Sequence, residues 1–205
     1  TRRKIASLLH VSASEIIFTS GGTEADNMAL RCAVKDLNVK TIITSPIEHH
    51  AVLHTVEDLA RSGDVQMVTV PVLENGHIDL DALENLLEKH DHVLVRLMHG
   101  NNEIGNLLPL LKVSKMCRQH NAFFHSDTVQ TMGHYELNLQ ELDIDFITCA
   151  GHKFHGPKGV GFLYVNKKLN VKPIIQGGAQ ERGLRGGTEN IYGIIGLGKA
   201  MEIER

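Results

Sequence analysis

Short apolar runs alternate along the chain with segments of helical periodicity. Six runs have the length of strands and are separated by candidate helices: 16–19, 41–44, 65–70, 93–98, 122–125 and 146–149. Runs such as "VLVRLM" and "TIITS" are apolar on nearly both faces, which is typical of parallel strands that helices cover on each side. The alternation predicts repeated βαβ units and therefore an α/β fold with a mostly parallel sheet.

A seventh apolar run, "GVGFLYVN" at 159–166, follows its predecessor after a short loop rich in Gly and Pro. The loop leaves no room for a crossover helix, so this run is predicted to be an antiparallel strand of the same sheet. The chain opens on "TRRKIASLLHVSASEIIF", interpreted as an amphipathic helix, and closes on "GIIGLGKAMEIER", a helix without a stop signal. Both ends look cut from a longer protein, and no internal domain boundary is indicated.

Composition narrows the kind of partner. The 205 residues are 42% hydrophobic and 22% charged, which suits one large or two small domains. A net charge of -3 without a basic stripe argues against nucleic acid or an anionic membrane, and no apolar run reaches the roughly 18 residues of a membrane span. Cys32, Cys117 and Cys149 are an odd number without CxxC spacing, which favours a reduced, cytoplasmic protein that acts on a small molecule.

The residues that follow each apolar run carry the candidate chemistry, because ligands bind at the carboxyl ends of strands in such sheets. After the run 16–19 come Gly21, Gly22 and Thr23, and a helix is predicted from about Ala25. Two glycines let a ligand approach, and free N–H groups at a helix start attract an anion such as phosphate. A plain tight turn with Thr23 as N-cap is the alternative.

Three histidines follow the run 41–44. His50 and His54 are spaced i, i+4 and could bind zinc, but the glutamate that HExxH requires is missing, so no metal site is predicted. His49 comes first after the strand and is better placed to lie against a flat ring. Solvated histidines at a helix start are the alternative.

Amides and one acid follow the next two strands. Asn101 and Asn102 come after the run 93–98, where side-chain amides could donate to a phenolate oxygen or simply form a structural turn. Asp127 comes after the run 122–125, with Gln130 three residues on. Such an acid could keep a pyridinium nitrogen protonated, or it could be an N-cap.

Lys153 lies in "CAGHKFHGPKGVGF", where surrounding glycines leave no bulky side chain to shield it. Its amine would be nucleophilic next to a cationic or apolar site, although lysines in such turns are often merely solvated. The stretch 193–199, "GIIGLGK", matches GxxxxGK but lacks the following hydroxyl and a preceding strand. An ATPase is therefore rejected, and without GxGxxG a nicotinamide site has no support.

The strand ends together offer a phosphate cradle, a ring-stacking histidine, an amide, an acid and a lysine, which is what pyridoxal 5'-phosphate requires. The sequence also resembles a known family. "TSGGTEADN", "EHHAVL", "MHGNNEIG", "HSDTVQTMG", "GHKFHGPKGVGFLYV" and "ERGLRGGTEN" are similar, in order and over nearly the whole chain, to signatures of the cysteine desulfurases, which are fold type I pyridoxal-phosphate enzymes.

The resemblance implies catalytic and cofactor-binding roles for residues within these motifs. Lys153 would form the Schiff base with the cofactor and move the Cα proton, while His49, the second catalytic residue, would stack on the ring and take part in proton transfer. Thr188 would reach across a homodimer to the neighbour's phosphate. The implied cofactor-binding residues are Gly22, Thr23, His49, Asn102, Asp127, Gln130, His152, Lys153 and Thr188.

The resemblance also implies a reaction, in which L-cysteine gives L-alanine and a persulfide on an enzyme cysteine. A sulfur-acceptor protein would use that sulfur for iron–sulfur clusters or tRNA thiolation. Residues 1–205 would be the large, cofactor-binding domain, without the N-terminal segment and the C-terminal small domain that carries the nucleophilic cysteine. One departure is Ala150, where the family commonly has serine. Selenocysteine lyase, an aminotransferase of the same fold and a catalytically silent fragment remain alternatives.

Overall fold

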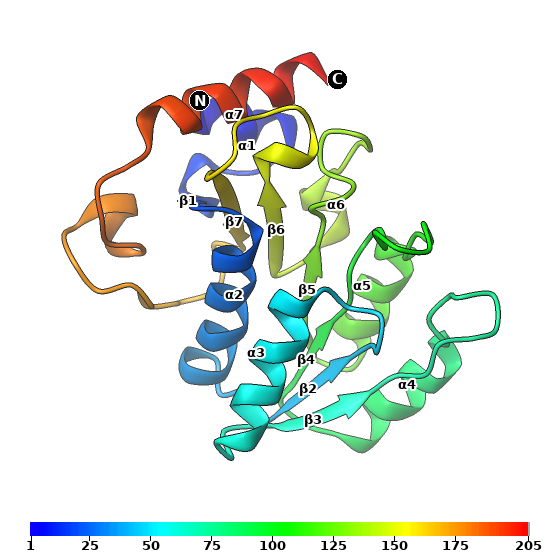
Figure 1. Cartoon of the computed structure of the whole chain (residues 1–205). Coiled ribbons are helices and arrows are strands. Elements are labelled where there is room, and N and C mark those ends of the chain that lie inside the picture. Colours follow the sequence, from blue (N-terminus) through cyan, green and yellow to red (C-terminus); the bar gives the residue numbers. More distant parts are fainter. Residues whose placement is uncertain (205) are drawn as a thin grey trace.

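One seven-stranded sheet runs through the molecule with helices on both faces (Figure 1). The computed structural model describes residues 1–204. The strands are β1 (Ile16–Thr19), β2 (Thr41–Thr44), β3 (Gln66–Thr69), β4 (Val93–Arg96), β5 (Phe123–Asp127), β6 (Phe146–Ala150) and β7 (Gly161–Val165). The α-helices are α1 (Arg2–Leu8), α2 (Gly22–Asp36), α3 (His50–Arg61), α4 (Leu80–Lys89), α5 (Leu110–Gln119), α6 (Leu139–Leu142) and α7 (Ile191–Ile203). Short 3-10 helices are η1 (Ala13–Glu15), η2 (Gly151–Lys153) and η3 (Gln180–Gly183).

The strand order confirms the predicted sheet. The strands lie in the order β1-β7-β6-β5-β4-β2-β3, and β7 is antiparallel to both of its neighbours while the other pairs are parallel. Gly161, at the start of β7, pairs with Thr19 on one side and Ala150 on the other. A Cβ at Gly161 would lie 2.2 Å from the carbonyl oxygen of Cys149, so β7 can begin there only with glycine.

Two apolar layers hold the helices against the sheet. Helices α2 and α3 lie over one face (Figure 1), where side chains such as Ala29 and Val52 pack on Leu94. Helices α1, α4, α5 and α7 pack on the other face, with Val113 and Leu197 among their buried contacts. Because both faces are covered, β2 and β4 are buried along their whole length, as their apolar sequences predict, whereas the edge strand β3 is partly exposed.

Helix boundaries differ from the sequence-based expectation at two places. Helix α2 begins at Gly22, three residues before the predicted start near Ala25, and Gly21, with φ 152°, is its N-cap. Thr23 therefore lies inside the first turn, and the alternative that makes it the N-cap is wrong. The predicted N-terminal helix is shorter than expected: α1 ends at Leu8, and a separate 3-10 helix, η1, covers residues 13–15 before β1 begins.

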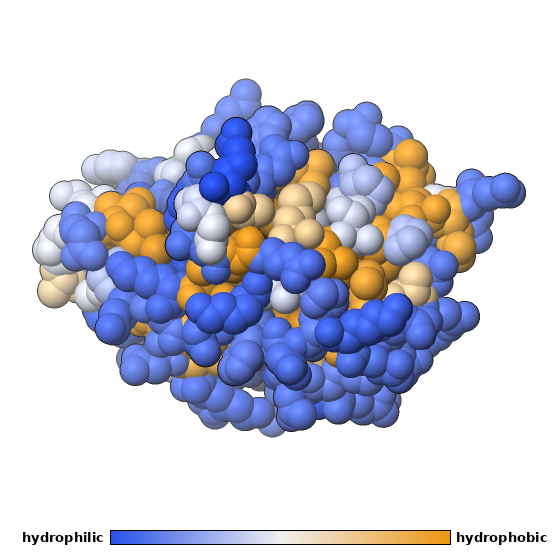
Figure 2. Space-filling view, turned by 90° about the horizontal axis from the view of Figure 1, so that it is seen from below, coloured by the Kyte–Doolittle hydropathy of each residue, from blue (hydrophilic) through white to orange (hydrophobic). Residues whose placement is uncertain are grey.

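Apolar side chains also reach the surface. Figure 2 shows apolar patches among hydrophilic side chains on the face seen from below. The exposed large apolar side chains are Leu73, Ile104, Leu107, Leu111, Tyr135, Ile175, Ile191, Tyr192, Ile195 and Ile203. Four of them belong to α7. Within residues 1–204, no helix combines the length and the apolar character needed to cross a membrane.

Candidate active site

A pocket of about 260 Å³ opens where the loops after β4, β5 and β6 meet the first turns of α2 and α3. Parallel strands end at the same edge of the sheet, so the loops that follow them converge. Eight of the nine predicted cofactor-binding residues line this pocket: Gly22, Thr23, His49, Asn102, Asp127, Gln130, His152 and Lys153. Asp26, Met98, Val129 and Ala150 complete the lining, and Thr188 lies outside it.

The first turn of α2 forms one end of the pocket. The N–H groups of Gly22 and Thr23 lie in the first turn of α2, where no carbonyl of the helix can accept their hydrogen bonds. The helix dipole adds positive potential at the same place. A Cβ at Gly22 would lie 2.9 Å from Cγ2 of Val129, so glycine allows α2 to approach the loop after β5. With the hydroxyl of Thr23, these donors fit a phosphate group.

His152 and Ala150 follow β6 and line the same pocket. Partial burial, and then the positive charges of Lys153 and Lys158, lower the pKa of His152, so its ring is neutral at neutral pH. A Cβ at Gly22 would lie 3.6 Å from the methyl group of Ala150, so side chain 150 adjoins the first turn of α2. Serine at this position would add a donor, and Ala150 supplies none.

His49 is the N-cap of α3, and its orientation is fixed by that role. Its Nδ1 accepts a hydrogen bond from the N–H of Ala51 at 3.1 Å. The neutral ring therefore carries its proton on Nε2. His50 and His54 follow on α3 with ring centroids 5.0 Å apart, outside the pocket. No cluster of three potential metal-binding side chains occurs in the part of the chain that the structure describes.

The sequence left two roles open for the asparagines after β4, a donor to a ligand or part of a structural turn, and the structure favours a different role for each. Asn101 is buried, and its amide donates to the carbonyl of Ile47 at 2.8 Å while its oxygen accepts from the N–H of Glu103. Asn101 thus holds the loop. Asn102 lines the pocket, as does Gln130, so these two amides are available to a ligand.

Asp127 is the last residue of β5 and turns its carboxylate toward the pocket. Its Oδ1 accepts from the N–H of Val129 at 2.7 Å, and its Oδ2 lies 3.6 Å from Nη2 of Arg96. The next α-helix begins only at Leu139, so the alternative of an N-cap aspartate is wrong. The bond from Val129 instead holds the carboxylate at the edge of the sheet.

A buried charged cluster behind Asp127 escaped the sequence analysis. We call Arg96, Asp26, Glu48, His125 and Asp127 the Arg96 cluster; all five are buried. Burial, and then the charge of Asp127, raises the pKa of Asp26 to about 8. Burial, and then the charge of Arg96, lowers the pKa of His125 well below its ordinary value. The available signal was Arg96 itself, a charged residue in the middle of the apolar run "VLVRLM".

Lys153 ends η2, directly after β6. Its side chain is exposed and lines the pocket, and its Nζ has no ion-pair partner among residues 1–204. A Cβ at Gly156 would lie 2.7 Å from the carbonyl oxygen of Gly151, so the absence of a side chain lets this turn fold back on itself. The amine is therefore presented to the pocket without a competing charge.

Thr188 belongs to a long segment, 176–190, which two ion pairs tie to the rest of the molecule. Glu181 accepts from Arg2 at 2.6 and 2.7 Å and from the N–H of Phe18 at 2.9 Å. Arg185 donates to Glu24, in the first turn of α2, at 2.7 Å. Thr188 lies beside Arg185 in a separate hollow, so it does not reach the pocket of its own chain.

All three cysteines are free and buried. Burial raises the pKa of Cys32 and of Cys117 to about 12 and that of Cys149 well above its ordinary value. A thiol becomes a nucleophile only as the thiolate. None of the three is therefore suited to accept sulfur.

We expect Cys32, Cys117 and Cys149 to resist iodoacetamide in the native protein at neutral pH and to react after denaturation. Burial raises the pKa of Cys32 and Cys117 to about 12 and that of Cys149 well above its ordinary value, so the reactive thiolate is scarce at neutral pH. Peptide mapping by mass spectrometry measures the label at each position. Rapid native labelling of any of the three would contradict their burial.

Comparisons with known proteins agree with this fold. Residues 1–204 match the family model described as aminotransferase class-V, and the chain belongs to that family. It is similar to the cysteine desulfurase IscS of Dictyoglomus turgidum, with 46% identity over 98% of this chain and 51% of that protein. The corresponding values for the IscS of Methanosarcina thermophila are 44%, 98% and 50%. The chain thus spans about half the length of the curated relatives it matches.

Solved structures show the same likeness. One described as a NifS-like protein superposes with a TM-score of 0.94 at 43% identity, over 99% of this chain and 56% of that chain. Another, titled SspA in complex with cysteine, gives 0.88 at 34% identity, over 98% and 58%. These findings confirm the resemblance to the cysteine desulfurases and the fold type I architecture.

Enzymes of this family use pyridoxal phosphate. The pocket fits that cofactor by the chemistry of its donors. It holds an anion-binding helix start at Gly22 and Thr23, a carboxylate at Asp127 and an unpaired amine at Lys153. These three parts match the phosphate, the ring nitrogen and the aldehyde of the cofactor.

Proposed function

We propose that this chain is the large, cofactor-binding domain of a pyridoxal-phosphate-dependent cysteine desulfurase, which converts L-cysteine to L-alanine and transfers the sulfur to an enzyme cysteine. The meeting of Lys153, Asp127 and the start of α2 in one pocket carries the proposal. Relatives named cysteine desulfurase, and a structural neighbour titled as a complex with cysteine, support cysteine as the substrate.

The pocket residues divide the work as follows. When bound, the cofactor supplies an electron sink for bond changes at the substrate Cα. The unpaired amine of Lys153 is available to hold the cofactor and then to move the Cα proton. Asp127 can accept the N–H of the ring nitrogen, while Asn102 and Gln130 can donate to the phenolate oxygen. His49 is proposed to stack on the cofactor ring and to take part in proton transfer through Nε2, since its Nδ1 accepts from the N–H of Ala51.

The acceptor of the sulfur is proposed to lie outside the described residues. Cys32, Cys117 and Cys149 are buried with raised pKa values, so a persulfide would need a thiol elsewhere in the full-length protein. From there the sulfur would pass to an acceptor protein for iron–sulfur clusters or tRNA thiolation. Three free thiols without a disulfide suit a reducing compartment, which supports the cytoplasm as the location.

A homodimer is part of the proposal. Thr188 lies outside the pocket of its own chain but on an anchored segment, so it is available to a neighbouring subunit. The exposed apolar residues Ile191, Tyr192 and Ile195 of α7 lie just beyond it. A surface of this kind supports contact with further protein, from a second copy or from the rest of the chain.

The full-length protein tests the proposed reaction. With pyridoxal phosphate, L-cysteine and a thiol reductant, it should form alanine and sulfide in equal amounts, well above the rate of the free cofactor. Because the nucleophile is expected elsewhere, a variant with Cys32→Ser, Cys117→Ser and Cys149→Ala should retain the activity of the wild type. Alanine and sulfide are measured over time.

Other products would redirect the assignment. Keto acid formed together with an amine acceptor would indicate an aminotransferase, and turnover of selenocysteine alone would indicate a lyase for that substrate. A protein that binds no pyridoxal phosphate would be a silent scaffold. Loss of activity in the triple cysteine variant, with the fold and cofactor retained, would place the nucleophile among the described residues after all.

A further inference from the structure

The guanidinium of Arg96 lies at the centre of the Arg96 cluster, in β4, with no exposed surface. Strand register places Arg96 opposite His125 of β5, on the face that α2 and α3 cover. Its Nη1 is in contact with Glu48, and its Nη2 lies 3.0 Å from Asp26 and 3.6 Å from Asp127. Removing such a cation from water costs several kcal/mol unless it is well paired. Arg96 and its three carboxyl partners therefore depend on one another.

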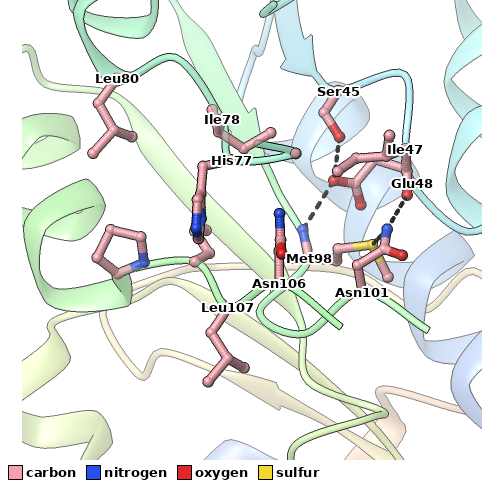
Figure 3. Close-up of a pocket in the computed structure, with 13 residues that line it drawn as sticks. Ser45, Ile47, Glu48, His77, Ile78, Leu80, Met98, Asn101, Asn106 and Leu107 are labelled. Atoms are coloured by element: carbon pink, nitrogen blue, oxygen red, sulfur yellow. Dashed lines mark hydrogen bonds between the residues drawn. The ribbon is translucent and has the colours of Figure 1, made fainter. Parts of the chain in front are cut away.

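The carboxylates are held in place by further bonds. Oε1 of Glu48 accepts from the hydroxyl of Ser45 at 2.8 Å and from the N–H of Met98 at 3.0 Å, as Figure 3 shows. Figure 3 also shows that Glu48 and Met98 form part of the wall of a second pocket, of about 170 Å³, which holds none of the nine implied cofactor-binding residues. With Asp127 fixed by Val129, the cluster is a rigid arrangement of charges.

Positive charge is scarce in this cluster. Burial and the charge of Arg96 lower the pKa of His125, so His125 stays neutral. Within residues 1–204, Arg96 is then the one cation that faces the three carboxyl groups. Burial raises the pKa of Asp26 to about 8, so Asp26 holds a proton at neutral pH, and burial raises the pKa of Glu48 as well. Within residues 1–204, Arg96 is therefore the cation that faces the carboxylate of Asp127.

Arg96 lies on the side of Asp127 that faces away from the pocket. It does not line the pocket, whereas Asp127 does, so Asp127 stands between Arg96 and any ligand in the pocket. The effect of a cation on proton affinity falls with distance. For a proton shared between Asp127 and a ring nitrogen in the pocket, Arg96 repels it more strongly from Asp127. The proton is thus displaced toward the nitrogen.

We propose that Arg96 is a positioning residue of the cofactor site, which keeps Asp127 as a carboxylate and thereby keeps the ring nitrogen of bound pyridoxal phosphate protonated. The inference rests on the proposed function, because it needs the cofactor in this pocket. Arg96 does not touch the ligand and acts through Asp127. The electron sink needs a protonated ring nitrogen, so a buried cluster that does not itself touch the cofactor would set the cofactor's reactivity.

Solid-state ¹⁵N NMR tests this without measuring turnover. The full-length protein is loaded with pyridoxal phosphate labelled with ¹⁵N in the ring, and the resonance reports whether the nitrogen carries a proton. The wild type and Arg96→Lys should show a protonated nitrogen, because both keep the buried cation. Arg96→Met should show an unprotonated one. Arg118→Met is the matched control, since it removes an arginine paired with Asp145 away from the pocket, and should leave the resonance unmoved.

A second variant covers the case in which Arg96→Met does not fold. Arg96→Met combined with Glu48→Gln removes one positive and one negative charge, and the new amide oxygen can still accept from Ser45 and Met98. The nitrogen should be unprotonated here too. A protonated nitrogen in either Arg96→Met variant, or an unprotonated one in the wild type or in Arg96→Lys, overturns the role of Arg96. Wild-type protein that binds no cofactor would refute the proposed function itself.

Discussion

Lys153→Ala should abolish covalent attachment of pyridoxal phosphate. In the wild type, borohydride reduction of the loaded protein is expected to fix the cofactor on the peptide that contains Lys153, because no other lysine lines the pocket among the described residues. In the full-length enzyme, loss of the amine should lower turnover by at least about 10²- to 10⁴-fold, the usual contribution of one acid–base group. Peptide mapping and steady-state rates measure the two effects.

Lys158→Ala is the control for this experiment. Lys158 lies five residues further along the same loop and its charge acts on His152, but it does not line the pocket. Its removal should leave both covalent loading and turnover close to the wild type. Cofactor recovered on Lys158, or on no lysine at all, would refute the assignment of Lys153.

Asp127→Asn should separate cofactor binding from catalysis. An amide oxygen can still accept from the N–H of Val129, so the loop and the covalent loading should persist. A neutral amide cannot balance a protonated ring nitrogen, so turnover should fall by about 10²- to 10³-fold, as for other single preorganised electrostatic partners. Loading is followed by the absorbance of bound cofactor, and turnover by alanine formation.

A surface carboxylate provides the comparison. Asp58 forms an exposed ion pair with Arg31 at 3.0 Å. Asp58→Asn should change neither the cofactor loading nor the turnover. If Asp127→Asn turns over at the wild-type rate while fully loaded, Asp127 is a structural residue of the strand end and has no electronic role.

The sheet could be predicted because strands that are buried on both faces have continuous apolar sequences. Strands such as β2 and β4 are continuous apolar runs, and the loop before β7 is too short for a crossover helix. The start of α2 was placed too late, at Ala25, because Gly21 and Gly22 have the composition of a turn. Gly22 is nevertheless helical, and the absence of a side chain there lets the start of α2 lie close to Val129.

The pocket could be predicted from single residues, since each strand end delivers its side chain to the same edge of the sheet. The Arg96 cluster could not. Arg96 and Asp26 lie 70 positions apart, and their pairing depends on how α2 packs against the sheet. Arg96 is conspicuous as a charge within an apolar run, but only tertiary packing shows that Asp26, an aspartate inside a helix, is one of its partners.

The ion pair between Arg2 and Glu181 has a consequence for the timing of synthesis. Its partners are 179 positions apart, and β1 pairs in the sheet only with β7. At about 5–20 residues per second on the ribosome, Arg2 emerges on the order of ten to forty seconds before Glu181 exists. Until β7 has also been made, β1 has no neighbour to pair with, while β2, β4, β5 and β6 can assemble as they emerge. Although β1 is the earliest of these seven strands in the chain, it is thus among the last to join the sheet.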